Sequence, residues 1–177
     1  MSQNLKIVSL IKEADFIGTL FFSLVGRKPS KKEKTILNAI LVSSLALNPE
    51  NRGVITKAMD VFKEISGKGD DIEKSSIKLV DYYINNKEKI SGFGHPYYKD
   101  FDPRAKSLFE VARKNELDIQ FMNIARQIEH SLEDRLDQKF VLNIYGAIAA
   151  LLLTLDIDSL AGESILVSLN NITLVTN

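Results

Sequence analysis

The sequence predicts an all-α fold, and three observations lead to that prediction. Apolar residues recur at helical spacing, and no alternation of apolar and polar residues persists long enough to indicate a sheet. Apolar residues make up 45% of the chain and charged residues 26%, which excludes intrinsic disorder and coiled-coil extremes. A chain of 177 residues can bury a core without disulfides, so we expect a globular protein.

The first two predicted helices are marked by their caps and breaks. Ser30 and Glu33 have the spacing of a capping box, which opens a helix after a proline. We expect this helix to end before Asn48, because the proline that follows disfavours helical geometry in the residue before it. A second amphipathic helix is expected from near Asn51 to the Gly-Lys-Gly turn at 67–69.

The middle of the chain contains a third helix and then an irregular segment. Asp70 or Asp71 can cap the third helix. From 90 to 101 the helical pattern breaks, because Gly, Pro and aromatic residues follow one another with no period. Asp102 followed by Pro103 then indicates an N-cap with proline at the first helical position, so a further helix begins there.

The last third of the chain is predicted to form three helices. An amphipathic stripe marks a helix over about 119–136. The stretch 146–155 is apolar on all sides and is therefore expected to be the most buried helix. A last helix follows Asp158, and we expect the Asn170-Asn171 pair to end it.

Charge and residue types exclude several classes of function. Lys and Arg together number 23, as do Asp and Glu, so no global field favours nucleic acid or an anionic membrane. The chain has no Cys and two His, so we expect no disulfide, no thiol nucleophile, no metal site and no resident cofactor. Because the first residues lack the pattern of a signal peptide and 147–153 is too short to span a bilayer, a cytoplasmic protein is expected.

Residues 92–104 hold the greatest concentration of unusual chemistry. Glycines let backbone N–H groups approach a ligand, and Arg104 lies in the first turn of a predicted helix, where anions are favoured. His95 can donate a hydrogen bond to a carbonyl oxygen, and Lys99 can meet a phosphate. The segment therefore predicts a site for an oxygen-rich anion.

A purely structural interpretation of the same segment stays open. In that interpretation His95 is bonded to the backbone of its own loop, and Arg104 pairs with Asp100 or Glu110. His130 carries no functional expectation, because it falls near the end of a helix where a solvated histidine is usual.

Three segments of the sequence, 91–105, 143–150 and 21–29, carry motifs that resemble those of the citrate synthase family, which includes citryl-CoA lyase-like and methylcitrate synthase-like enzymes. Residues 91–105, SGFGHPYYKDFDPRA, resemble the family signature GFGH...YK..DPRA. Residues 143–150, NIYGAIAA, resemble the family segment NVDGAIAA, and residues 21–29, FFSLVGRKP, resemble an early helix and loop. The resemblance implies an almost wholly α-helical fold, here reduced in size and usually dimeric in the family.

The resemblance also divides the chain into two kinds of structure. It implies large-domain-like remnants at about 1–50 and 150–177, and small-domain-like helices with the signature loop at about 51–149. In the family, the site lies between a large and a small domain that close on the substrates. We describe the whole chain, 1–177, as one reduced citrate synthase-like domain.

The reaction that the resemblance implies is an aldol-Claisen condensation. In the family, a carboxylate takes a proton from acetyl-CoA, a histidine stabilises the enol, a second histidine polarises the keto group of oxaloacetate, and arginines hold its carboxylates. On matching positions, His95 takes the keto-polarising role and Arg104 a carboxylate-binding role. The residues expected near the CoA are Gly92, Phe93, Gly94 and Lys99.

Two catalytic positions depart from the family pattern. Tyr145 stands where the catalytic carboxylate belongs, and a phenol is a poor base at neutral pH. Asn51 stands where the first histidine of an HGGA-like element belongs, and an amide cannot carry a proton away. Several helices that normally precede this element have no counterpart after Leu47, and no counterpart of the family's C-terminal arginine is recognisable.

Three functions follow from this combination. In the first, the chain binds acyl-CoA and/or a keto dicarboxylate such as oxaloacetate as a catalytically impaired, ligand-binding or regulatory subunit. In the second, it is an active acyltransferase or citryl-CoA lyase-type enzyme that acts on a CoA thioester, with Tyr145 as proton donor or a replacement base. The candidate bases are Asp100, Asp102, Asp156 and Asp158. In the third, it is a helical interaction module. A homodimer, or a hetero-oligomer with another citrate synthase-like chain, is expected.

Overall fold

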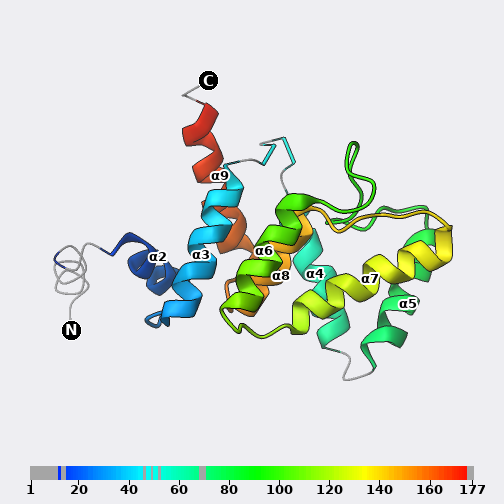
Figure 1. The fold of residues 1–177 in the computed structure, drawn as a ribbon, viewed down its shortest axis with the longest axis horizontal. Helices are drawn as coiled ribbons and strands as arrows, with labels where there is room; N and C mark the ends of the chain where they lie inside the picture. The colour runs from blue at the N-terminus through cyan, green and yellow to red at the C-terminus, as the bar shows by residue number, and fades with distance from the viewer. Residues whose placement is uncertain are drawn as a thin grey trace.

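The computed structural model describes Lys12 and residues 15–45, 47, 48, 50, 51, 53–67 and 71–174. Its helices are α2 (Phe16–Val25), α3 (Lys31–Ser44), α4 (Val54–Ser66), α5 (Ile72–Asn85), α6 (Pro103–Lys114), α7 (Gln120–Leu136), α8 (Ile144–Thr154) and α9 (Ser159–Leu174). Within the described residues, the extended pairing is a single isolated bridge between Phe93 and Leu142. The all-α prediction is therefore confirmed (Figure 1).

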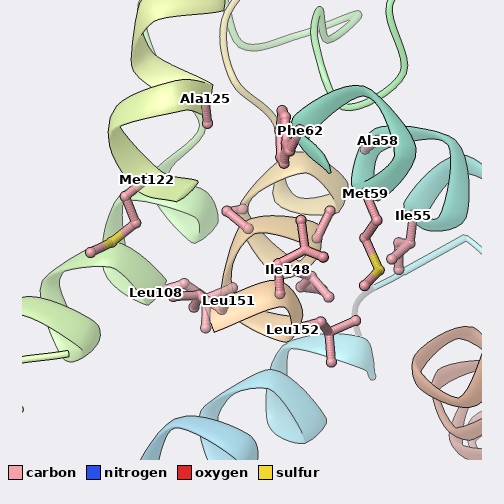
Figure 2. Packing of buried hydrophobic residues seen from close by; sticks show 14 of the residues in the cluster. Ile55, Ala58, Met59, Phe62, Leu108, Met122, Ala125, Ile148, Leu151 and Leu152 are labelled. Atoms are coloured by element: carbon pink, nitrogen blue, oxygen red, sulfur yellow. The ribbon is translucent and has the colours of Figure 1, made fainter. Parts of the chain in front are cut away.

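Helix α8 is the centre of the hydrophobic core. Nearly all of its residues are buried, and helices α4, α6 and α7 pack around it. In Figure 2, side chains of these three helices converge on Ile148, Leu151 and Leu152 of α8. The prediction that 146–155 is the most buried helix is confirmed, because buried residues run without a break from Gly146 to Leu153 and so cover every face of the helix.

Helix α9 packs onto this core at a close contact with α8. Leu166 is buried, and a Cβ added at Gly162 would lie only 2.8 Å from a methyl carbon of Leu152. Apolar contacts thus hold α9 in place. Every helix in the described part of the chain is too short or too polar to cross a lipid bilayer.

The caps that the sequence predicts are present. Ser30 and Glu33 form the capping box of α3, and Asp71 caps α5; the alternative cap, Asp70, lies outside the described residues, as do the first ten residues. The Arg27 guanidinium, opposed by partial burial, lowers the pKa of Glu33 to about 2. The capping box therefore carries a full negative charge beside the positive end of the α3 dipole.

One predicted boundary is wrong. The last helix does not end at the Asn170-Asn171 pair but continues to Leu174. Asparagine lowers helix propensity only modestly, and no glycine or proline follows to stop the helix.

Candidate functional site

The signature loop is fixed against the N-terminus of α8. The Asn143 side chain caps α8 by accepting hydrogen bonds from the backbone N–H groups of Tyr145 and Gly146 at 3.0 and 3.3 Å. The Nδ2 of Asn143 donates to the carbonyl oxygen of Gly94 at 3.0 Å, and the backbone N–H of Asn143 donates to the carbonyl oxygen of Gly92 at 2.9 Å. Gly92 has a φ of +92°, and a Cβ there would lie 2.8 Å from Gly146 Cα. Glycine is therefore required for this approach.

The carboxylate of Asp102 joins α6, α8 and Arg104. It is buried, with 1% of its surface exposed. Oδ1 accepts from the backbone N–H and Nε of Arg104, both at 3.0 Å, and Oδ2 accepts from Arg104 Nη2 at 2.8 Å and Ile144 N–H at 3.0 Å. Burial opposes ionisation, but the hydrogen bonds from Arg104 and Ile144 outweigh it and lower the pKa of Asp102. Pairing of Arg104 with Asp100 or Glu110 is therefore wrong, because Asp102 takes that place.

The two ring nitrogens of His95 both face hydrogen-bond donors. Nδ1 accepts from the backbone N–H groups of Tyr97 and Tyr98, each at 3.1 Å, and Nε2 lies 3.2 Å from Nη2 of Arg104. Because a neutral imidazole carries one proton and two amides occupy Nδ1, we assign the proton to Nε2. The Nε2 proton and the guanidinium then face one another. Because Nε2 and Nη2 lie only 3.2 Å apart, one oxygen atom beside both groups can accept from both, as a ligand carbonyl or carboxylate oxygen can do.

The surroundings of His95 favour the neutral ring. Burial and the positive charge of Arg104 lower the pKa of His95 from its usual value. The ring stacks on Tyr98, with centroids 4.4 Å apart, and the Arg104 guanidinium lies 5.5 Å from the centre of the same Tyr98 ring. Tyr98 thus supports both side chains, and His95 acts as an uncharged donor at neutral pH.

The structure brings together the two residues that stand in altered catalytic positions. The Tyr145 hydroxyl accepts hydrogen bonds from Nδ2 of Asn51 and from the backbone N–H of Asn48, both at 2.9 Å. Its own donation, to the carbonyl oxygen of Asn48, is long at 3.5 Å. A hydroxyl that accepts from two amides has no lone pair available to remove a proton from carbon.

The charge of Arg104 is stabilised by its neighbours in the site. Its pKa is raised chiefly by the hydrogen bond to Asp102, and Tyr98 and Tyr145 contribute to the same shift. The structure brings residues that the sequence singles out into two close pairs: His95 with Arg104, and Tyr145 with Asn51.

The residues expected near a CoA are distributed more widely. Phe93 and Gly94 line a cavity of about 570 Å³ that reaches His95, and its opposite wall comes from α5, α7 and Phe140. Gly92 is buried beneath the loop, and Gly94 N–H donates to the carbonyl oxygen of Val141 at 2.8 Å. The exposed Lys99 makes only a long contact, 3.4 Å, with the carbonyl oxygen of His95.

The four replacement bases considered from sequence have other surroundings. Asp102 is held by Arg104, and Asp158 caps α9 by accepting from two backbone N–H groups. Asp156 occupies a turn with a φ of +57°, and Asp100 is exposed. The hydroxyl of Tyr145 contacts amide groups rather than any of these carboxylates. The described residues also contain no cluster of three or more His, Asp or Glu side chains suited to a metal ion.

Sequence reasoning missed Glu163 of α9. Its carboxylate accepts hydrogen bonds from the backbone N–H of Gly53 and the hydroxyl of Thr56 at the start of α4, close in sequence to Asn51. Glu163 is separated from Gly53 by 110 residues, so no local sequence pattern predicts this contact.

Comparison with protein families identifies the family of the chain. The family profile described as citrate synthase, C-terminal domain, matches residues 33–167. That match covers most of the 177 residues, so the chain belongs to the citrate synthase family. Among curated proteins, no sequence match was found.

Three solved structures share the fold. Citryl-CoA lyase from Hydrogenobacter thermophilus is 24% identical with a TM-score of 0.80, over 95% of this chain and 77% of that one. ATP citrate lyase from Methanothrix soehngenii, in complex with citrate and coenzyme A, is 22% identical with a TM-score of 0.61, over 92% of this chain and 30% of that one. A mutant ATP citrate lyase from Methanosaeta concilii, in complex with (3S)-citryl-CoA, is 21% identical with a TM-score of 0.58 and the same coverages. At these identities the likeness establishes the fold.

Asp102→Asn is expected to lower the free energy of unfolding by about 2 to 3 kcal/mol, because it leaves Arg104 and the Ile144 N–H without a charged acceptor. Folding lowers the pKa of Asp102, so its stabilisation is complete above the unfolded-state pKa of about 4 and is lost as the pH falls through the folded-state pKa. Urea denaturation at several pH values measures both effects. Asp100→Asn, in the same loop, is the control; a difference from wild type that does not shrink in acid contradicts the assignment.

His95 is expected to be protonated at Nε2 and not at Nδ1 at neutral pH, because two backbone N–H groups face Nδ1. Its folded-state pKa lies below the unfolded value of about 6.5, so protonation opposes folding and this residue lowers stability as the pH falls below that value. Long-range proton–nitrogen NMR spectra of the imidazole identify the tautomer. The exposed His130 provides the reference signal. A proton found on Nδ1 of His95 refutes the assignment.

Proposed function

We propose that this chain binds a keto dicarboxylate such as oxaloacetate, a CoA thioester, or both, and does not abstract a proton from carbon. One observation carries the proposal. Hydrogen-bond donors of His95 and Arg104 lie side by side. At the positions where the resemblance expects a base and its partner, the chain has Tyr145 and Asn51, which form a hydrogen bond of 2.9 Å with each other.

The ligand's oxygen atoms provide the first part of the argument. The Nε2 proton of His95 and the guanidinium of Arg104 lie side by side, and one carbonyl or carboxylate oxygen of a ligand can accept hydrogen bonds from both. The ionised Asp102 offsets the charge of Arg104, so binding relies on directed hydrogen bonds more than on net charge. We therefore expect a dissociation constant on the order of micromolar to millimolar.

The cavity beside His95 supports a CoA thioester as a ligand. Its walls are mainly apolar and aromatic, with Phe93 and Phe140 among them, and its volume of about 570 Å³ suits part of such a molecule. Solved structures with the same fold include complexes described with citrate and coenzyme A and with (3S)-citryl-CoA. These ligands combine the same two chemistries, carboxylate oxygens and a CoA group.

The altered half of the site supports a binding role over turnover. Removal of a proton next to a thioester needs a positioned base and a donor to the developing oxyanion. The Tyr145 hydroxyl accepts from two amides and so cannot serve as that base. A ligand-binding or regulatory subunit fits this arrangement. Assembly with a second citrate synthase-like chain is part of the proposal, because apolar residues are exposed on the adjacent helices α3 and α9: Val42 on α3, Leu45 just after it, and Leu160 on α9.

Isothermal titration calorimetry with oxaloacetate, citrate and acetyl-CoA tests binding. We expect at least one to bind, and Arg104→Gln to weaken binding of the dicarboxylates by about tenfold or more, because a charge-assisted pair of hydrogen bonds is lost. Arg113→Gln removes an exposed arginine at the far end of α6 and is the matched control. No binding of any of the three at millimolar concentration rejects the proposal.

Exchange of the acetyl-CoA methyl protons with deuterated water tests the absence of a base. With wild-type protein and bound ligand, we expect no exchange above the buffer rate, since Tyr145 and Asn51 hydrogen-bond to each other. Proton NMR of the methyl group over time gives the rate. Exchange that Tyr145→Phe abolishes would instead favour an active enzyme of the same class.

A further inference from the structure

Helix α4 obtains its N-terminal cap from another helix. Its N-cap residue, Gly53, has a φ of +77° and no side chain, and the first turn of α4 contains no acidic residue. The Glu163 carboxylate of α9 accepts from the backbone N–H of Gly53 and from the hydroxyl of Thr56. This contact satisfies an N–H group at the helix start and sets a negative charge near the positive end of the helix dipole. Glu163 thus supplies across space what a capping box supplies locally.

The segment just before α4 is held at its other end by Tyr145. The backbone N–H of Asn48 and the side chain of Asn51 both donate to the Tyr145 hydroxyl. Two hydrogen bonds to Asn48 lie within the segment. The backbone N–H of Asn51 donates to the carbonyl oxygen of Asn48 at 3.1 Å, and the backbone N–H of Glu50 donates to the side-chain Oδ1 of Asn48 at 3.0 Å. The turn is thus anchored to α8 through Tyr145 and, two residues beyond Asn51, to α9 through Glu163.

We infer that Glu163 is a positioning residue for the candidate site: by fixing the start of α4, it holds the amides of Asn48 and Asn51 on the Tyr145 hydroxyl. With both lone pairs occupied, the hydroxyl offers only its proton. Its acceptor within the protein is 3.5 Å away, so an oxygen atom of a ligand in the candidate site can compete for that proton. Glu163 therefore orients the Tyr145 hydroxyl so that it donates a hydrogen bond to the ligand. This last consequence rests on the proposed function.

The role is separable from the stability of the fold. Helix α9 is held by apolar contacts, with Leu166 buried and Gly162 packed closely on Leu152. Loss of the Glu163 carboxylate leaves these contacts unchanged. We therefore expect its variants to keep their helical content while the turn before α4 loosens.

Carbon-13 NMR of tyrosines labelled at Cζ tests the inference without a ligand. The chain has five tyrosines and no tryptophan, and Tyr145→Phe identifies the Tyr145 signal. In Glu163→Ala we expect this signal to move towards that of Tyr97, whose side chain is 85% exposed, while the other four stay in place. Amide exchange at Asn48 and Asn51 is expected to rise by about tenfold. Glu163→Gln, which keeps an acceptor oxygen, is expected to recover part of the effect.

Two further variants keep the test decisive. Thr56→Val removes the other half of the contact without touching Glu163 and is expected to shift the Tyr145 signal in the same direction. Glu116→Ala removes an exposed ion pair with Lys32 and is expected to leave the signal unchanged. If Glu163→Ala fails to fold, Thr56→Val decides the matter. A Tyr145 signal unchanged in the folded variants overturns the inference.

Ligand binding separates this inference from the proposed function. If wild-type protein binds a dicarboxylate, Glu163→Ala is expected to weaken it by about fivefold to tenfold, with partial recovery in Glu163→Gln. Unchanged affinity overturns the role of Glu163 in the ligand site. If wild-type protein binds none of the ligands, the proposed function fails, and the tyrosine signal alone decides whether Glu163 positions the turn.

Discussion

The buried carboxylate of Asp102 is the contact on which the site depends. It accepts hydrogen bonds from Arg104 and from the first residue of α8, so one ionised group joins the starts of two helices and directs a guanidinium towards His95. A buried charge is tolerated only when its lone pairs are satisfied, and here they are. The orientation of Arg104 is therefore a consequence of helix packing rather than of a free side-chain choice.

The two pairs of side chains in the candidate site differ in their hydrogen bonding. On one side, His95 and Arg104 present donors to an oxygen atom; on the other, Tyr145 and Asn51 are bonded to each other. Membership of the citrate synthase family establishes the fold, whereas activity depends on the side chains that the fold carries. The proposal of binding without turnover rests on this difference between the two pairs of side chains.

The connection between α9 and α4 extends this arrangement beyond the signature loop. The turn that carries Asn51 lies between Tyr145 of α8 and the carboxylate of Glu163, so two helices determine its place. Apolar packing holds α9 on the core independently of that carboxylate. At this contact, the packing of α9 and the anchoring of the turn involve different residues.

Local patterns in the sequence determined the helices, the Ser30–Glu33 capping box, the Asp102 cap and the burial of α8, because each depends on residues within one or two turns of one another. Only the tertiary structure decided that Asp102 reaches Ile144 across 42 residues, that Asn51 meets Tyr145 across 94, and that Glu163 caps α4. Spacing along the chain carries no information about such pairs. They form where packed helices bring distant backbone and side-chain groups within hydrogen-bonding distance.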